Sequence, residues 1–118
     1  MQKTNARLQS PEHPVNRLIA ALGEFRRIDA EFPMQYAICL LEIARNEGLS
    51  LTELAERTNM ALSTVSRVVG ALSDYRSNGQ PFELITMQIS AEERRRKELY
   101  LSDRGKKLIS ALEKVISA

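Results

Sequence analysis

The chain has 118 residues and a net charge of +2, with 43% hydrophobic and 27% charged residues. These values fit one globular domain and exclude a largely disordered chain. No apolar run approaches the roughly 20 residues that cross a bilayer, and no signal-peptide core follows Met1, so we expect a cytoplasmic protein without membrane contact. One histidine and one cysteine, Cys39, exclude an internal disulfide and a zinc site built from Cys and His, and we predict no metal site.

The positive charge is concentrated in the last third of the chain. Residues 1–49 carry six basic and six acidic side chains, and residues 50–79 carry three of each. Residues 80–118 carry eight basic and six acidic side chains, and Arg94 to Lys97 form a cationic run within them. The sequence therefore predicts a local basic patch and no strong overall field.

The N-terminal third predicts an arm and two helices. Residues 1–13 are polar and contain Pro11, so we interpret them as a flexible arm, with a single domain over residues 14–118. Apolar residues then recur at helical spacing at Val15, Leu18, Ile19, Leu22 and Phe25, which predicts a helix over 14–30. A second helix is expected from Pro33 through Ala44. It is apolar on much of its circumference, so we expect Cys39 to be a core residue.

The middle of the chain predicts a helix-turn-helix. Ser50 and Glu53 have the spacing of a capping box, which starts a short helix at Leu51 that ends near Thr58. Asn59 suits a left-handed turn. A further helix begins at Leu62 or Ser63, and its inner face carries Val65, Val68, Val69 and Leu72. This order places Ser63, Thr64, Ser66 and Arg67 on the outer face, near the N-terminus of the second helix.

The remaining sequence predicts a β-hairpin and a last helix. Residues 77–81, Ser-Asn-Gly-Gln-Pro, signal a turn. Alternating apolar residues over 85–89 and 99–101 predict two strands, and the polar segment between them is the tip, with Arg94, Arg95 and Arg96. A helix follows over 103–118. The fold class is therefore mainly α with a small β-hairpin: a winged helix-turn-helix whose lobe spans residues 33–101.

The outer helix face and the hairpin tip suit contact with double-stranded DNA. Short hydroxyls and Arg67, free of acidic side chains, fit a surface that enters the major groove. The arginines of the tip suit the flanking minor groove. The alternative is a plain helical hairpin with solvated caps, followed by a turn whose arginines are balanced by Glu92, Glu93 and Glu98. The combination of helix-turn-helix and arginine-tipped hairpin favours DNA.

The two end helices, 14–30 and 103–118, each carry an apolar stripe that must be buried. We predict that they form a two-fold homodimer interface, which would place two outer helices about one DNA turn apart. The alternative is that both helices pack on their own domain. The predicted interface residues are Val15, Leu18, Leu22, Phe25, Leu108, Leu112, Val115 and Ile116.

Four segments of the chain resemble the MarR family of bacterial transcriptional regulators. They are residues 51–57 (LTELAER), 63–69 (STVSRVV), 93–95 (ERR) and 99–105 (LYLSDRG), within a resemblance that covers roughly residues 33–118. The resemblance implies that Arg95 enters the minor groove, that Glu93 orients it through an ion pair, and that Gly105 is the family's glycine. The chain departs from the family in its long link from Ser73 to Phe82. It also has Ala61 at the position of the usual helix cap, which leaves Ser63 to cap the helix instead.

We therefore predict a sequence-specific, dimeric DNA-binding transcriptional regulator that acts as a repressor at a pseudo-palindromic operator. The alternative is a winged-helix module that binds protein within a larger assembly, which the near-neutral charge favours. An enzyme has no support, because the sequence offers no paired nucleophile and base and no nucleotide-binding loop. No cofactor is predicted. A small-molecule effector is implied by the family resemblance alone, and we expect weak or absent control by one.

Overall fold

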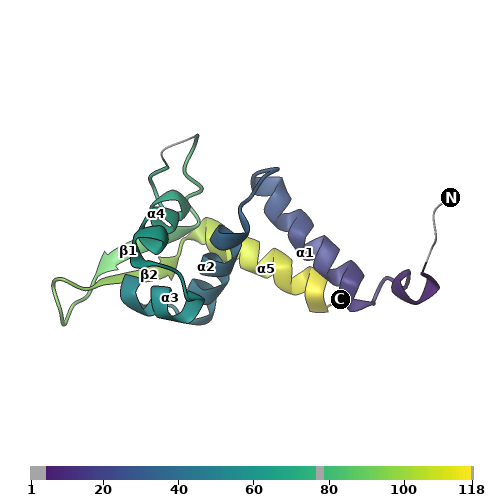
Figure 1. Cartoon of the computed structure of the whole chain (residues 1–118), viewed down its shortest axis with the longest axis horizontal. Coiled ribbons are helices and arrows are strands. Elements are labelled where there is room, and N and C mark those ends of the chain that lie inside the picture. Colours follow the sequence, from purple (N-terminus) through teal and green to yellow (C-terminus); the bar gives the residue numbers. More distant parts are fainter. Residues whose placement is uncertain (1–4, 77–78, 118) are drawn as a thin grey trace.

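The computed structural model describes residues 5–76 and 79–117 and contains six helices and one two-stranded sheet within them. The elements are η1 (Ala6–Leu8), α1 (Pro14–Ile28), α2 (Met34–Arg45), α3 (Leu51–Thr58), α4 (Leu62–Leu72), β1 (Ile85–Ile89), β2 (Lys97–Leu101) and α5 (Asp103–Ser117). Figure 1 shows α2, α3, α4 and the hairpin gathered in one lobe, from which α1 and α5 extend side by side. The chain is elongated, measuring 59 × 29 × 26 Å. The predicted fold class, a winged helix-turn-helix that is mainly α, is confirmed.

The segment before α1 has more local structure than the predicted flexible arm. Residues 6–8 form a 3-10 turn that Asn5 caps. The side-chain amide of Asn16 donates to the carbonyls of Leu8 and Ser10, at 2.6 and 2.7 Å. His13 caps α1: its Nδ1 accepts a hydrogen bond from the backbone N–H of Val15 at 3.1 Å.

The helix-turn-helix forms as its local signals predict. The hydroxyl of Ser50 accepts from the backbone N–H of Glu53, and the Glu53 carboxylate accepts from the N–H of Ser50, which completes the capping box. Asn59 ends α3 in the left-handed conformation with φ 56°. The N-cap of α4 is Ala61, which provides no side-chain cap. The prediction that Ser63 caps this helix is wrong, because α4 already begins at Leu62.

The hairpin is the wing, and backbone hydrogen bonds attach it to the lobe. Strands β1 and β2 are antiparallel, with Ile85 opposite Leu101 and Met87 opposite Leu99. The backbone of Leu99 also exchanges hydrogen bonds with the segment before α3: it donates to Leu49 at 2.9 Å and accepts from Gly48 at 2.7 Å. This pairing fixes the wing beside α3.

The link from α4 to the wing returns along the end of α4. The N–H of Phe82 donates to the carbonyl of Ala71, and the N–H of Leu84 donates to the carbonyl of Leu72, at 2.9 and 2.7 Å. The predicted turn at 77–81 falls partly on residues 77 and 78, which lie outside the described residues. The long link is therefore attached at both ends to α4 and the core.

The core lies where α2, α3, α4 and the wing meet. Leu40, Ile43, Leu54, Leu72 and Leu84 are fully buried there. Cys39 is also fully buried, and desolvation, followed by the nearby Glu42 carboxylate, raises the pKa of its thiol to about 11. The interpretation of Cys39 as a core residue therefore fits. Met34 and Met87, by contrast, are exposed.

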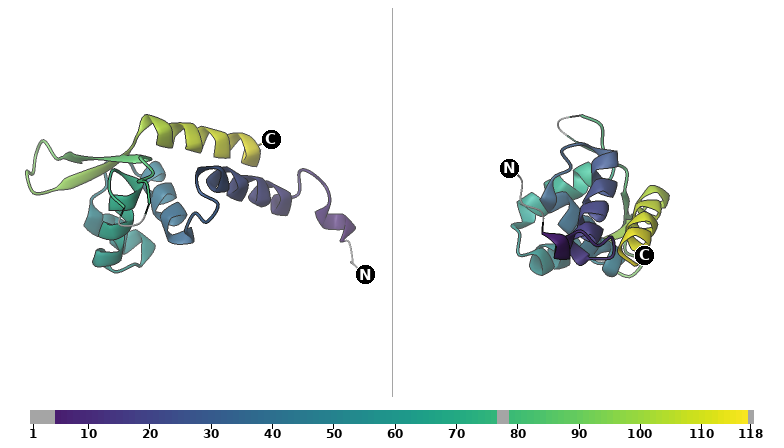
Figure 2. Two further views of the ribbon diagram at one scale, coloured as in Figure 1. Left: turned by 90° about the horizontal axis from the view of Figure 1, so that it is seen from above. Right: turned by 90° about the vertical axis from the view of Figure 1, so that its right-hand side faces the viewer.

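The apolar stripes of the end helices divide between the chain's own core and its surface. Helices α1 and α5 pack against each other, as two further views show (Figure 2). Phe25, Leu108 and Leu112 are buried in this contact or in the lobe, and Val115 is half-buried. For these residues the alternative holds, because they are buried where the end helices pack on their own chain. Four predicted interface residues remain exposed: Val15, Leu18, Leu22 and Ile116.

Candidate nucleic-acid interface

The outward face of α4 carries the polar residues predicted to contact DNA. Val65 and Val68 are fully buried and fix the rotation of the helix. Because of this rotation Ser63, Ser66 and Arg67 are exposed, while Thr64 is half-buried. No carboxylate lies on α4, so this face presents hydroxyls and one guanidinium.

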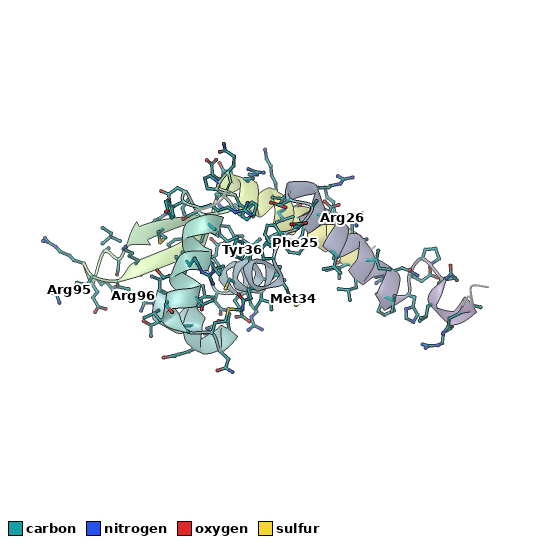
Figure 3. All side chains as sticks on the ribbon, turned by 45° about the horizontal axis from the view of Figure 1, so that its top comes forward. Phe25, Arg26, Met34, Tyr36, Arg95 and Arg96 are labelled. Carbon is teal, nitrogen blue, oxygen red and sulfur yellow. The ribbon has the colours of Figure 1, made fainter. Side chains whose placement is uncertain are left out.

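The wing tip is shaped by a small hydrogen-bonded turn. The Ser90 hydroxyl accepts from the backbone N–H groups of Glu92 and Glu93, each at 3.2 Å. The N–H of Ser90 donates to the carbonyl of Arg96 at 2.8 Å, and the N–H of Arg96 donates to the carbonyl of Glu93 at 2.9 Å. Arg94 and Arg95 are consequently exposed at the end of the hairpin. Figure 3 places Arg95 at the outer end of the wing and Arg96 nearer the helices.

The ion pair of the wing differs from the predicted one. No ion pair joins Glu93 and Arg95 among the described side chains; instead Arg96 pairs with Glu53 of α3 and, at 3.7 Å, with Glu98 of β2. The physical reason is the tip turn, which directs Arg95 outward and Arg96 back toward α3. The prediction of a Glu93–Arg95 pair is wrong. Arg96, grouped with the DNA-contacting arginines, is occupied by partners within the chain.

Glu53 joins the helix-turn-helix to the wing. Its carboxylate accepts hydrogen bonds from the Ser50 backbone and from the Arg96 side chain. These bonds, the Ser50 bond first and the Arg96 bond second, hold the pKa of Glu53 below its usual value, and the same pairing raises the pKa of Arg96. One residue thus caps α3 and braces the wing. The sequence indicated the cap but not the brace, because Arg96 lies 43 positions away.

Two clefts flank α4. The wing-side cleft, of about 610 Å³, lies between α3, α4 and the wing; it is lined by Ser50, Leu51, Thr52, Glu53, Leu62, Ser66, Glu93, Arg95, Arg96 and Lys97. The link-side cleft, of about 560 Å³, lies between α2, α4 and the link; it is lined by Tyr36, Ser63, Ser66, Arg67, Gly70, Ala71, Tyr75 and Arg76. Ser66 lines both, so α4 forms the ridge between them.

Several residues that line these clefts were not predicted from the sequence to contact DNA. Thr52 and Lys97 line the wing-side cleft, and Tyr36, Tyr75 and Arg76 line the link-side cleft. Lys97 belonged to the cationic run and Arg76 to the unusually long link, so both had a signal in the sequence. Tyr36 had none, because only the packing of α2 against α4 brings it there.

The comparisons with known proteins agree with this geometry. A sequence model of the MarR family matches residues 32–74, which include α2, α3 and α4. The match covers less than half of the chain and shows similarity to the MarR family over these three helices. A comparison with curated protein sequences gave no match.

Solved structures of MarR and of other proteins share the fold. S. aureus MepR, crystallised in complex with DNA, is 20% identical, with a TM-score of 0.70 over 85% of this chain and 75% of MepR. MarR itself is 24% identical, with a TM-score of 0.60 over 89% and 77% of the two chains. Streptomyces coelicolor PcaV, crystallised with its natural ligand, is 22% identical, with a TM-score of 0.61 over 99% and 79%. At these identities the likeness establishes the fold.

The MarR fold explains Gly105 in physical terms. A Cβ at this position would clash with the backbone carbonyl of Leu84, which also accepts a hydrogen bond from the N–H of Ser102 at 3.0 Å. The Ser102 hydroxyl accepts from the N–H of Gly105 at 3.0 Å and starts α5. The glycine therefore permits the close approach of α5 to the strand that leads into the wing.

The described residues contain neither a helix that could span a membrane nor a cluster of metal ligands. Within residues 5–76 and 79–117, no helix is sufficiently long and apolar to span a membrane. Across the same residues, no three His, Cys, Asp or Glu side chains are grouped closely enough to hold a metal ion.

Proposed function

We propose that this chain is a member of the MarR family and a sequence-specific DNA-binding transcriptional regulator. The observation that carries the proposal is the wing-side cleft, because Ser66 of α4 and Arg95 of the wing border the same hollow. A recognition helix in the major groove and a wing in the next minor groove must face one duplex in this way. Under this proposal Ser63, Thr64, Ser66 and Arg67 contact the major groove, and Arg94 and Arg95 contact the minor groove.

The active form in this proposal is a homodimer at a pseudo-palindromic site. Val15, Leu18, Leu22 and Ile116 are exposed on the α1–α5 pair, and a second copy would cover them. A dimer that covers a promoter excludes the polymerase, so we assign the protein the role of a repressor.

Met34 is exposed near the junction of α1 and α2, where an apolar hollow of about 230 Å³ is lined by Leu22, Phe25, Arg26, Asp29, Ala30, Phe32, Met34 and Ala37.

Selection of duplexes from a random pool tests binding, symmetry and half-site spacing together. The expected product is an inverted repeat whose half-sites lie about one helical turn apart. Binding should weaken steeply with salt, because it displaces counterions from the DNA backbone. A wild-type protein that selects no sequence and binds no duplex in a salt-dependent way would contradict the proposal. It would favour the alternative, a winged-helix module that binds protein, which predicts co-purification with a stable partner.

A further inference from the structure

We propose that the link between α4 and β1 binds the DNA backbone on the side of α4 that faces away from the wing. In this inference Tyr75 and Arg76 of the link, together with Arg67 of α4, form a site for a phosphate of the second DNA strand. The inference rests on the proposed function and names a contact surface that the wing and the recognition helix do not supply.

The link-side cleft has the chemistry of a phosphate site. Its lining residues include two arginines, Arg67 and Arg76, and four hydroxyl-bearing residues, Tyr36, Ser63, Ser66 and Tyr75. No acidic residue lines it, although Arg76 pairs with Asp29 outside the lining. Arginine, serine and tyrosine side chains are common donors to phosphate oxygens. Tyr75 is 68% exposed, and its hydroxyl has no hydrogen-bond partner among the described residues.

The position of the cleft follows the shape of the duplex. A helix in the major groove lies between two phosphate backbones, since the groove is about 12 Å wide. A wing that reaches the neighbouring minor groove must cross one of these backbones, which then occupies the wing-side cleft. The other backbone lies on the opposite side of the α4 ridge, where the link stands. Figure 1 shows the wing and the link leaving the region of α4 in different directions.

Packing within the chain holds Arg76, Phe82 and the backbone of Tyr75 in place before any DNA is bound. Arg76 pairs with Asp29 at 3.4 Å, and its guanidinium carbon lies 4.6 Å from the centroid of the Phe82 ring. Phe82 is buried among Phe32 and Tyr36. The N–H of Tyr75 donates to the carbonyl of Gly70 at 2.8 Å. These contacts order the Arg76 side chain and the backbone of Tyr75 in advance, which lowers the entropy cost of binding.

The test compares Tyr75→Phe and Arg76→Gln with wild type on the selected duplex. Lys114→Gln is the control, because it removes one positive charge from an exposed position near the end of α5. Tyr75→Phe removes only a hydroxyl from an exposed ring and should weaken binding several-fold with an unchanged salt slope. Arg76→Gln should weaken binding about ten-fold and reduce the slope by up to about one. Lys114→Gln should change neither the affinity nor the salt slope by a comparable amount.

Neutral methylphosphonate linkages, placed singly in the duplex, locate the contact. Wild type should lose affinity when the linkage lies on the strand away from the wing, beside the recognition helix. At that position the Tyr75→Phe protein should lose less, because one partner of the phosphate is already absent. Equal affinities and equal methylphosphonate profiles for wild type and Tyr75→Phe would overturn the link site while leaving DNA binding intact. Absence of DNA binding by wild type would overturn the proposed function as well.

Discussion

Arg95 and Arg96 are neighbours in the wing and have the same side chain, but their surroundings differ. Arg95 is exposed at the tip, whereas Arg96 is half-buried and pairs with Glu53 and Glu98. A side chain that is free in the unbound protein can give its charge to DNA without breaking a contact. Arg96 is held by two carboxylates, through Nη2 and Nε, whereas Arg76 of the link has one ion pair, with Asp29, through Nη1 alone. We therefore assign the minor-groove contact to Arg95 and the orientation of the wing to Arg96.

Arg95→Ala should reduce DNA affinity and lower the salt slope of binding by about one, because a single cationic contact is lost. Thermal unfolding should not change, since Arg95 has no ion-pair partner among the described residues. Arg96→Ala should lower both the affinity and the unfolding temperature. Binding titrations at several salt concentrations, paired with calorimetry, separate the two roles. Identical profiles for the two variants would contradict the assignment.

The brace at Glu53 predicts a pH-dependent difference in stability. Its pKa is lowered in the folded protein, so its stabilising effect is present above the unfolded pKa of about 4.3 and is lost as the pH falls through the lower folded pKa. Wild type should therefore unfold at a higher temperature than Glu53→Gln at neutral pH, and the gap should close in acid. Glu56→Gln, at an exposed carboxylate of α3, is the control and should show a smaller gap. A gap that persists unchanged in acid would argue against the ion pair.

At the scale of the elements, caps and close contacts decide where each segment begins and how it packs. The capping box starts α3, Asn59 ends it, and the hydroxyl of Ser102 starts α5. The capping box could be predicted from spacing, because Ser50 and Glu53 act within three residues. The need for Gly105 could not be derived from spacing, since the carbonyl that excludes a side chain belongs to Leu84.

Gly105→Ala should destabilise the fold by about 1–3 kcal/mol, because α5 must move away from the Leu84 carbonyl to admit a methyl group. Gly23→Ala is the matched control within α1, since nothing lies within 4 Å of the added Cβ. This second substitution should raise stability by about 0.5–1 kcal/mol through helix propensity. Chemical denaturation measures both. A Gly105→Ala variant with unchanged stability would show that the close approach of α5 to the Leu84 carbonyl does not require glycine.

Ser50→Ala should cost about 1 kcal/mol, because the N–H of Glu53 loses its cap. The effect should be visible in urea denaturation as a lower midpoint with an unchanged slope. Ser63→Ala is the control, since Ser63 is exposed on α4 and does not cap that helix. A loss at Ser63 as large as that at Ser50 would indicate that capping is not the cause.

At the scale of the molecule, an elongated chain separates the lobe from the α1–α5 pair. The packing of these helices on each other buries part of their apolar stripes, including Phe25 and Leu108. The rest remains on the surface, including Leu18 at 59% and Leu22 at 56% exposure. Large apolar side chains that are neighbours on one helix face and unburied favour a partner there. This arrangement is the basis of the proposed homodimer.

Leu18→Glu and Leu22→Glu should each convert the dimer to a monomer, because a carboxylate would be buried in the proposed interface. Circular dichroism should not change, since both side chains are exposed in the single chain. Ile89→Glu, at a 69% exposed position of the wing, is the control and should leave the dimer intact. Light scattering after size-exclusion chromatography reports the mass. A wild-type protein that is monomeric at micromolar concentration would contradict the proposal.

The sequence by itself determined the elements and the outward face of α4, because these depend on signals within one or two turns of a helix. The spacing of Val65 and Val68 places Ser66 and Arg67 on the opposite face, and the alternation over 85–89 predicts the wing. Only the tertiary structure decided which charges pair and which apolar residues stay exposed. Arg96 reaches Glu53 because Gly48 and Leu49 pair with the wing, and Phe25 is buried within its own chain, where it packs against Phe32. Contacts of this kind join residues that are far apart in the sequence, so local sequence patterns do not predict them.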